Sequence, residues 1–531
     1  MKYPIGIQTF SQIREDGYVY VDKTDLVYSL ATEGKIYFLS RPRRFGKSLL
    51  VSTLESYYLG RRELFRGLKI DSLETEWKEY PVFRLDFNGQ NFLNVGTLEE
   101  SLDGQLSGWE ERYGVTRRYE DFGLRFAAVL ERAYRETGRR CVVLVDEYDK
   151  PLLDVMDTDV TVPREGGSAV SLEEHNRDIL KGFYSTFKAA DESLQFVLLT
   201  GVTKFSQVSV FSGFNQPKDI SMSPKYESLC GITEEEMVEV FREPIAEMAD
   251  RFGCGFGEMV ATLKKRYDGY HFSKNMEGIF NPFSLLNAFD QLDVQDYWFR
   301  TGTPTYLIRL LRHFDENLDE LTGRYYTTDQ FVDYKADSER PLPMIYQSGY
   351  LTIKDFRQRT NTFLLDFPND EVKRGFTSLL ANNYLKGRED VNSWLVNAVD
   401  DLYDGHLDAF RDRLTSFFAS IPYEMRRKDS EREKERYFHY TFYLLLRLAS
   451  TYVTYTEKRQ SQGRVDCVIE TDGYVYIFEF KLDGTAAEAL AQIEEKGYAQ
   501  EYATDPRRLY KIGVDFSSEA GTIDGWQVAE R

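Results

Sequence analysis

Two kinds of hydrophobic pattern alternate along the first part of the chain. Short apolar runs bounded by polar residues predict strands, and longer segments with apolar residues at helical spacing predict helices. The predicted strands are 18–21, 36–39, 80–87, 141–145 and 196–199. The predicted helices are about 25–31, 47–59, 97–111, 121–137 and 172–190. Strands alternating with helices predict a parallel sheet, whose ligands bind beyond the carboxyl ends of its strands.

The pattern changes in the remainder of the chain. Residues 232–290 are typical of a small helical region, in which Thr233 and Glu236 have the spacing of a capping box. Residues 291–425 are mostly helical by pattern and contain no recognisable chemical constellation. From 426 a mixed-charge stretch leads into a second α/β region. Its predicted helices are about 430–449 and 486–502, and its predicted strands are 451–457, 463–469, 474–481 and 508–514.

Length and composition limit the class of protein. A chain of 531 residues exceeds one hydrophobic core and predicts about two to four domains. A net charge of −20 argues against a broadly basic surface that coats nucleic acid, although a narrow basic groove stays compatible with it. The four cysteines are scattered and predict neither a disulfide framework nor a zinc site. Because no membrane span or signal peptide is recognisable, we expect a cytoplasmic protein with no membrane partner.

The most informative stretch follows the predicted strand 36–39. Its break at Pro42 and its Gly46-Lys47-Ser48 triplet give the strand, loop and helix layout of a phosphate-binding P-loop. Lys47 would reach the terminal phosphates, and the Ser48 hydroxyl would ligate Mg²⁺. Arg41 occupies the position of the usual first glycine, so a basic turn before a helix is the alternative. The residues expected to bind nucleotide here are Arg43, Arg44, Phe45, Gly46, Lys47, Ser48 and Leu49.

Acidic and hydroxyl side chains follow two further predicted strands. Asp146 and Glu147 come directly after the apolar run 141–145, and Thr203 follows the run 196–199. In a parallel sheet these strand ends meet at the P-loop edge. We therefore expect Asp146 to hold Mg²⁺ through water, Glu147 to polarise the attacking water, and Thr203 to sense the γ-phosphate of ATP. The alternative for the two acids is a solvated strand end.

A second chemical pattern lies near the C-terminus. Asp466 precedes a turn, and Glu479 and Lys481 stand two apart on one predicted strand, hence on the same face. Two carboxylates of this kind can hold one or two Mg²⁺ ions, with Mn²⁺ as a substitute, which polarise a scissile phosphate. Lys481 would orient or activate the attacking water. The alternative is a salt-bridge cluster in a domain that has lost catalysis.

These stretches resemble a known family, the bacterial AAA-ATPase-like proteins with a C-terminal PD-(D/E)XK nuclease-type domain. The matching N-terminal segments occur in the same order as in that family. They are 21–24, 41–49, 145–152, 199–206, 211–215, 230–236, 267–272 and 281–284. The C-terminal match spans nearly all of 430–515 and includes Gln462–Asp466 and Phe478–Lys481.

The resemblance carries further implications. An arginine at position 41 is normal for that family, and its P-loop fold binds nucleotide and oligomerises. Gln492 would lie on the helix that flanks the nuclease site as a catalytic residue, and Glu435 would add a carboxylate. The implied fold class is α/β: an AAA-like P-loop NTPase with a parallel sheet and helical lid, a helical middle region, and a restriction-endonuclease-like α/β domain. The expected divisions are 1–231 (ATPase core), 232–290 (lid), 291–425 (connecting region) and 426–531 (nuclease-like domain).

The leading hypothesis is an ATP-gated, metal-dependent nuclease. ATP and Mg²⁺ would bind at the P-loop, and the C-terminal domain would cut nucleic acid, with DNA favoured over RNA as substrate. A homo-oligomer is expected, and a role in defence against phages or mobile elements is inferred from architecture alone. The alternative is a nucleotide-dependent switch or scaffold whose C-terminal domain binds without cleaving. A basic, concave surface near Lys481 would favour cleavage, and an acidic one would favour the scaffold.

Overall fold

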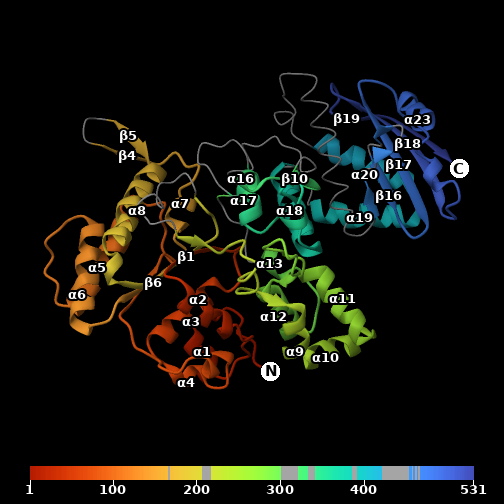
Figure 1. The fold of residues 1–531 in the computed structure, drawn as a ribbon. Helices are drawn as coiled ribbons and strands as arrows, with labels where there is room; N and C mark the ends of the chain where they lie inside the picture. The colour runs from red at the N-terminus through yellow and green to blue at the C-terminus, as the bar shows by residue number, and fades with distance from the viewer. Residues whose placement is uncertain are drawn as a thin grey trace. The chain divides into compact units, whose positions relative to one another are not determined.

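The protein was analysed as a computed structural model, and its chain forms two compact units, Met1–Lys373 and Arg374–Arg531 (Figure 1). The structure describes residues 1–164, 168–205, 217–300, 306, 321–332, 341–384, 391–420, 454–456, 459–460, 463–464 and 467–531. Cys141, Cys230, Cys254 and Cys467 form no disulfide with one another. None of the helices in these ranges has the length and apolar character needed to cross a bilayer.

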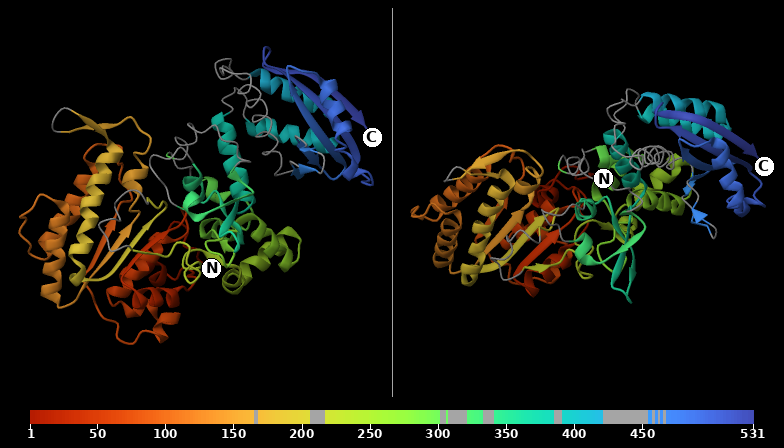
Figure 2. Two further views of the ribbon diagram at one scale, coloured as in Figure 1. Left: turned by 45° about the horizontal axis from the view of Figure 1, so that its top comes forward. Right: turned by 90° about the horizontal axis from the view of Figure 1, so that it is seen from above.

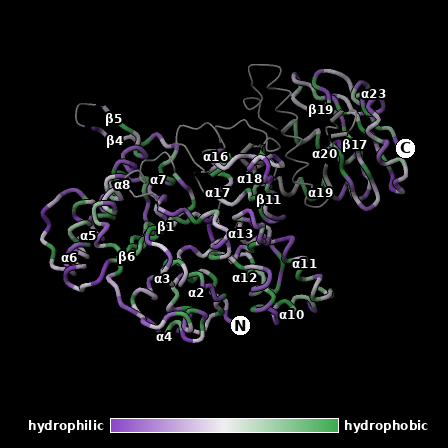
Figure 3. The backbone as a smooth tube through the Cα atoms, viewed as in Figure 1, coloured by the Kyte–Doolittle hydropathy of each residue, from purple (hydrophilic) through white to green (hydrophobic). Residues whose placement is uncertain are grey.

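A five-stranded parallel sheet forms the centre of the first unit. Its order is β2 (Val82–Asp86), β3 (Cys141–Asp146), β6 (Leu194–Gly201), β1 (Ile36–Ser40) and β7 (Lys218–Asp219). Every residue of β3 is buried, as its uninterrupted apolar run predicts. Hydrophobic residues gather along β6 in the same way (Figure 3). The predicted parallel sheet is therefore confirmed, and its strand order separates β1 from β3 by the width of β6.

Helices cover both faces of this sheet (Figure 2). The neighbouring residues Phe83 and Arg84 of β2 show the two faces, because their side chains point in opposite directions. Phe83 packs against Trp109 of α5 and Phe126 of α6, whereas Arg84 donates to Glu55 of α3. The helices are α3 (Lys47–Tyr58), α5 (Thr97–Arg112), α6 (Phe122–Thr137) and α8 (Leu172–Ala189). All four lie where the hydrophobic pattern predicts helices.

One local prediction is wrong, and one short element was not predicted. Residues 18–21 form no strand, because Val19 and Val21 pack against a helical core instead of pairing with a neighbouring strand. The loop before α8 contains a short hairpin of β4 (Thr161–Pro163) and β5 (Ala169–Ser171), which is largely exposed and so carries no hydrophobic signal. The other small elements of this part are α1 (Phe10–Glu15), α2 (Thr24–Glu33), α4 (Arg62–Phe65), η1 (Lys69–Ser72), α7 (Lys150–Leu153) and η2 (Asp191–Ser193).

A helical subdomain follows the sheet. It contains β8 (Ile232–Thr233), α9 (Glu234–Val240), α10 (Arg242–Phe252), α11 (Phe256–Tyr267), β9 (Ile279–Phe280) and α12 (Pro282–Gln291). Its core is built around Met237, Phe241 and Leu263. The predicted capping box is present, since Thr233 accepts from the Glu236 amide and Glu236 accepts from the Thr233 amide.

The helices predicted for the middle region are accompanied by a sheet that the pattern did not reveal. The described elements are α13 (Tyr297–Arg300), β10 (Arg324–Tyr326), α16 (Thr328–Phe331), α17 (Leu342–Gln347), β11 (Thr352–Arg357) and β12 (Thr362–Asp366). The three strands form an antiparallel sheet in the order β10-β12-β11. Each strand is short and only half-buried, so the two-residue alternation is weak in the sequence.

The second unit begins within α18 (Asp370–Tyr384) and continues through α19 (Val391–Asp404) and α20 (Leu407–Ser420). Its main sheet has the order β13 (Thr454–Thr456), β16 (Cys467–Glu470), β17 (Tyr474–Leu482), β18 (Arg508–Ser517) and β19 (Thr522–Glu530). Only β17 and β18 are parallel among these pairs. The remaining elements are β14 (Arg459–Gln460), β15 (Gly463–Arg464), α23 (Ala486–Glu495) and η3 (Gln500–Tyr502). The last strand, β19, was not predicted.

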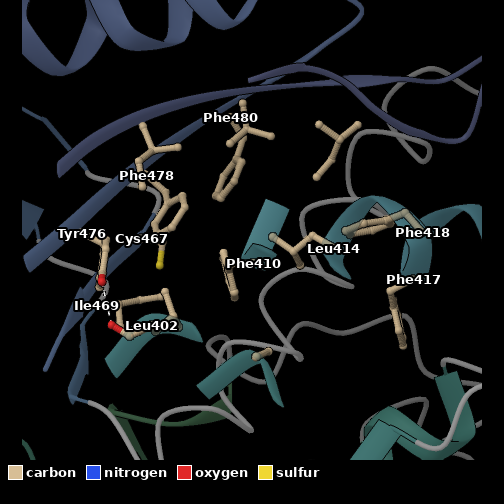
Figure 4. Packing of buried hydrophobic residues seen from close by; sticks show 14 of the residues in the cluster. Leu402, Phe410, Leu414, Phe417, Phe418, Cys467, Ile469, Tyr476, Phe478 and Phe480 are labelled. Carbon is tan, nitrogen blue, oxygen red and sulfur yellow. Dashed lines mark hydrogen bonds between the residues drawn. The ribbon is translucent and has the colours of Figure 1, made fainter. Parts of the chain in front are cut away.

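Strand β17 separates two hydrophobic layers. Phe478 and Phe480 point toward Phe410 and Leu414 of α20 (Figure 4). On the opposite face, Ile477 packs in a cluster with Ile493 of α23. Since side chains alternate along a strand, Glu479 and Lys481 lie on the α23 face. Because α19 and α20 pack on this sheet, the second compact unit starts before residue 426. The division of the chain into four parts, given above, stays a prediction.

Candidate functional site

The carboxyl ends of three strands meet beside the P-loop. Ser40 at the end of β1 pairs in register with Gly201 of β6, and the β3 residue Val145 pairs with Leu199. The loop 41–46, the Asp146-Glu147 pair and the 202–204 segment therefore leave the same edge of the sheet. The structure thus brings together the three groups of residues that the sequence assigns to nucleotide chemistry.

The P-loop is closed around the Lys47 ammonium group. This side chain is only 4% exposed, and its Nζ donates to the carbonyl oxygens of Arg41 at 3.0 Å and Pro42 at 3.3 Å. Gly46 has φ +89°, a left-handed conformation that favours glycine, and it precedes the first turn of α3. Ser48 and Leu49 belong to that turn. The N-terminus of α3 therefore presents unpaired backbone N–H groups to the loop, as anion binding requires.

The arginines of the loop differ sharply in their surroundings. Arg41 is 1% exposed, donates to the carbonyl oxygens of Ser221 at 2.7 Å and Tyr226 at 3.2 Å, and stacks on Phe272. Burial lowers the pKa of its guanidinium. Arg41 therefore connects the loop to the segment beyond β7 through these hydrogen bonds. Its side chain is buried, so it is not a solvated turn residue and is not exposed to a phosphate.

The three loop residues before Gly46 face the helical subdomain and the middle region. Arg43 is half-buried near Tyr306, and exposed Arg44 lies over Phe283. Arg44 has φ +69°, a conformation that is unfavourable for a residue other than glycine. Phe45 is buried edge-on against Tyr270 and Phe272. These contacts fix the loop from one side and leave Arg44 exposed beside it.

Asp146 is a buried carboxylate that is only partly hydrogen-bonded. It is fully buried; its Oδ1 accepts a hydrogen bond from the Thr200 hydroxyl at 2.8 Å, and its Oδ2 accepts none from any described residue. The Arg84 guanidinium lies 4.0 Å from Oδ2. Such a buried, incompletely satisfied carboxylate oxygen fits an oxygen-ligated Mg²⁺ ion. Sequence reasoning missed Thr200, although its position at the end of a buried strand would have been a usable signal.

Asp149 is a second buried carboxylate that the sequence did not single out. Its Oδ2 accepts from the backbone N–H groups of Val202 at 2.9 Å and Thr203 at 2.6 Å. Burial and the nearby Glu147 carboxylate raise the pKa of Asp149 to about 7. Glu147 itself is half-buried and has φ +51°. Asp149 therefore holds the end of β6 against the acidic turn after β3.

Thr203 is buried but its side chain turns toward the middle region. Its hydroxyl donates to the Met344 sulfur at 3.7 Å, and its carbonyl accepts from the Tyr148 hydroxyl at 2.7 Å. Of the two threonines on this segment, Thr200 is the one hydrogen-bonded to Asp146. The expected γ-phosphate contact of Thr203 stays a prediction.

A cavity of about 110 Å³ adjoins the P-loop. Its lining is mainly apolar and combines the N-terminal segment, the loop and the helical subdomain. The residues include Tyr20, Lys23, Phe45, Leu49, Cys230 and Phe241. Lys23 is 8% exposed, and its ammonium group pairs with Glu236 at 2.6 Å. Burial lowers the pKa of Lys23 against the opposing effect of Glu236. The cavity is thus apolar with one paired cation in its wall.

In the second unit, Gln492 of α23 joins the two predicted nuclease residues of β17. Its Oε1 accepts from the Lys481 ammonium group at 2.7 Å, and its Nε2 donates to Glu479. Glu479 is 2% exposed and Lys481 is half-buried. We call these two hydrogen bonds the Gln492 bridge. The amide group orients the carboxylate and the ammonium group on one face of the strand.

Gly513 explains how α23 comes so near. It pairs with Glu479 in the parallel register of β17 and β18. A Cβ atom at this position would lie 2.7 Å from the Leu490 backbone nitrogen and closer still to the Ala486 carbonyl oxygen. Glycine therefore permits the close packing of helix on strand that brings Gln492 over Glu479.

The surroundings of Lys481 are acidic. Asp515, its register partner on β18, is 6% exposed and accepts a hydrogen bond from the Gly484 amide at 3.0 Å. Burial raises the pKa of Asp515, with smaller contributions from Asp524, Asp483 and Glu488. The predicted residues Asp466 and Glu435 lie outside the described residues. Within the described ranges, no three His, Cys, Asp or Glu side chains form a group that could hold a metal ion.

Comparisons with known proteins match both ends of the chain. A family model described as "Predicted AAA-ATPase" matches residues 4–211, and one described as "PD-(D/E)XK nuclease superfamily" matches 433–526. A protein of Azotobacter chroococcum mcd 1, described as "Uncharacterized protein in vnfD 5'region", is 35% identical over 536 residues. That similarity covers 99% of this chain and 98% of the relative. The two ends are therefore similar to the two domains that the sequence motifs indicate.

Proposed function

Because the chain belongs to the family of AAA-ATPase-like proteins with a C-terminal PD-(D/E)XK nuclease superfamily domain, we propose that it couples ATP hydrolysis to nucleic-acid cleavage. ATP would bind to the first unit, and a phosphodiester bond would be cut in the second. The Gln492 bridge carries the nuclease proposal, since it holds Glu479 and Lys481 together on one face of β17.

In the first unit, the phosphates would lie in the loop 43–49. Lys47 would exchange its bonds to the Arg41 and Pro42 carbonyls for phosphate oxygens, and the N–H groups at the start of α3 would hold the anion. The adjoining apolar cavity fits the base, because ligand sites are mostly apolar with few polar groups.

Hydrolysis would use the acids after β3. Glu147 would polarise the attacking water, and Thr203 would sense the γ-phosphate. Thr200 keeps the Asp146 carboxylate oriented through their hydrogen bond. When bound, Mg²⁺ or Mn²⁺ supplies positive charge to phosphate oxygens; Ser48 and Asp146 would hold it in the first unit, and Asp466 and Glu479 in the second.

In the second unit, Lys481 orients the attacking water and stabilises negative charge that develops on the phosphate. Gln492 keeps the Lys481 ammonium group and the Glu479 carboxylate at fixed positions. We further propose DNA rather than RNA as substrate, a homo-oligomer as the working assembly, a cytoplasmic location, and a role in defence. The divisions 1–231, 232–290, 291–425 and 426–531 are proposed as the functional parts.

One observation favours a second candidate, a nucleotide-dependent switch or scaffold with a non-cleaving C-terminal domain. Asp515 stands beside Lys481, and Asp483, Asp524 and Glu488 add negative charge there. This acidic neighbourhood would repel a nucleic-acid backbone unless cations bind first. A metal-dependent enzyme overcomes that repulsion, whereas a scaffold would bind something other than nucleic acid.

The deciding experiment measures cleavage of single- and double-stranded DNA and RNA by the full chain. Mg²⁺ or Mn²⁺ is present, with and without ATP, and Lys47→Ala and Lys481→Ala are compared with the wild type. We expect metal-dependent cutting that is lost in Lys481→Ala and altered in Lys47→Ala. Equal cleavage by Lys47→Ala and the wild type would indicate a nuclease that is not gated by ATP. ATP binding without any cutting would support the switch.

A further inference from the structure

The middle region contacts the nucleotide site through α17. The Thr203 hydroxyl donates to the Met344 sulfur at 3.7 Å, and the Lys204 amide donates to the Gln347 side-chain oxygen at 2.9 Å. Met344 is fully buried and Gln347 is 5% exposed. The segment that follows β6 is therefore held by Asp149 on one side and by α17 on the other.

The turn after α17 also packs directly on the P-loop. Gly349 has φ +88°, and a Cβ atom there would lie 2.6 Å from the Pro42 Cβ. Only glycine allows this backbone conformation together with so close an approach. The middle region thus contacts both the phosphate-binding loop and the segment that would sense the γ-phosphate.

Trp298 of α13 provides a hydrogen-bonded connection out of the loop. Its indole Nε1 donates to the Arg43 carbonyl oxygen at 3.3 Å, and its backbone N–H donates to Glu371 Oε1 at 2.7 Å. The Ser284 hydroxyl donates to Glu371 Oε2 at 2.8 Å. Glu371 is 1% exposed, and burial raises its pKa to about 7. A buried carboxylate that depends on two donors for its satisfaction is sensitive to small movements of either donor.

Glu371 lies in the first turn of α18, Asp370–Tyr384. The first compact unit ends at Lys373 and the second begins at Arg374, so the same helix carries the chain from one unit into the other. A change at its first turn can therefore act on a helix whose residues belong to both units.

Phosphate binding would act at the start of this path. The Lys47 ammonium group donates to the Arg41 and Pro42 carbonyls, and phosphate oxygens would compete for the same donor. Such competition would change the hydrogen bonding of the Arg41 and Pro42 peptide groups. Arg43, the next residue, carries the carbonyl to which Trp298 donates. Nucleotide binding and the Trp298 hydrogen bond therefore depend on the same short stretch of backbone.

We propose that Trp298 and Glu371 are positioning residues that couple the nucleotide state of the P-loop to helix α18 and hence to the C-terminal unit. The coupling rests on the proposed nucleotide binding but does not require nuclease activity. It assigns a function to the middle region: α13 and α17 contact the loops that surround the phosphates, and α18 transmits the change.

Hydrogen exchange of the full chain tests this coupling. Calorimetry first measures binding of a non-hydrolysable ATP analogue with Mg²⁺, and exchange is then followed for amides of 370–379. In the wild type we expect the analogue to change exchange there by at least about fivefold, the lower end of ordinary coupling between sites. Trp298→Phe removes the indole donor, and Glu371→Gln removes the carboxylate charge with little change of shape. Both should still bind the analogue and lose the response.

Matched controls separate the outcomes. Trp109→Phe makes the same substitution on α5, against Phe83 and Phe126, and should respond as the wild type does. Ser284→Ala removes only the hydroxyl that donates to Glu371 and should weaken the response. This smaller substitution keeps the test decisive even if Trp298→Phe or Glu371→Gln unfolds the protein. Binding without a response in the wild type, or full responses in Trp298→Phe and Glu371→Gln, would overturn the coupling. Absence of binding in the wild type would overturn nucleotide binding itself, and the coupling with it.

Discussion

The nucleotide site and the Gln492 bridge place charged side chains at strand ends in different ways. The first draws on β1, β3 and β6, whose contributions are far apart in the sequence, and its acids are held by Thr200 and by backbone N–H groups. The second uses one strand and the helix that follows it, and a single amide makes both positioning bonds. We expect the loss of one supporting hydrogen bond in the first site to have a smaller effect than the loss of Gln492, which makes two hydrogen bonds in the second.

The largest expected effect concerns the buried carboxyl of Asp149. Its folded pKa is raised from 3.8 to about 7, so the native state binds more protons than the unfolded state between these values. The stability contributed by this group is thus present below about pH 4 and falls by roughly 4 kcal/mol as pH rises through 7. Urea unfolding of wild type and Asp149→Asn across this range should give a difference that declines with pH. A difference independent of pH would show that the pKa of Asp149 is the same in the folded and unfolded states.

Next in size is the loss of the Gln492 bridge. Gln492→Ala removes both hydrogen bonds that link Lys481 to Glu479, and we expect cleavage to fall by about 100-fold, as for other small misplacements of catalytic groups. ATP hydrolysis should not change. Glu495→Ala, on an exposed position of the same helix, is the control. Equal cleavage by Gln492→Ala and wild type would show that the second site does not need the hydrogen bonds of Gln492.

Gly513→Ala should have a smaller effect that is confined to the second unit. The added methyl group meets backbone atoms of α23, which must move away from β18, at an expected cost of about 1–3 kcal/mol. Differential scanning calorimetry should show a lower Tm for the C-terminal unit only. Gly473→Ala is a matched control, because a Cβ there has nothing within 4 Å. Equal melting of the two variants would mean that α23 adjusts freely.

The smallest expected effect is that of Thr200→Val. It removes the hydroxyl that donates to Asp146 and preserves the shape of the side chain. Because Asp146 keeps its place on a fully buried strand, we expect the rate of ATP hydrolysis to fall by only about tenfold, the equivalent of one hydrogen bond to a charged group. Steady-state ATPase rates at several Mg²⁺ concentrations measure the change. A fall in ATP hydrolysis by Thr200→Val as large as the fall in cleavage by Gln492→Ala would mean that the two sites are equally sensitive to the loss of one supporting side chain.

Much of the fold could be predicted because it depends on local pattern. The fully apolar run of β3, the amphipathic helices α5, α6 and α8, and the capping box at Thr233 are all visible in the sequence. The weak elements were missed for a physical reason. Strands β10, β11 and β12 are half-buried and short, and residues 18–21 alternate like a strand although they only pack against helices.

The candidate chemical residues can be recognised in the sequence because each group is a short motif with fixed spacing: the Gly46-Lys47-Ser48 loop, the Asp146-Glu147 pair and the Glu479-x-Lys481 strand. The partners of these residues depend on the folded arrangement of the chain. It buried Arg41 under Phe272, turned Thr203 toward Met344, placed Thr200 and Asp149 at the acidic edge, and joined Arg43 to Glu371 through Trp298. Such contacts connect residues far apart in the chain, and long-range packing leaves no periodic signal in a single sequence.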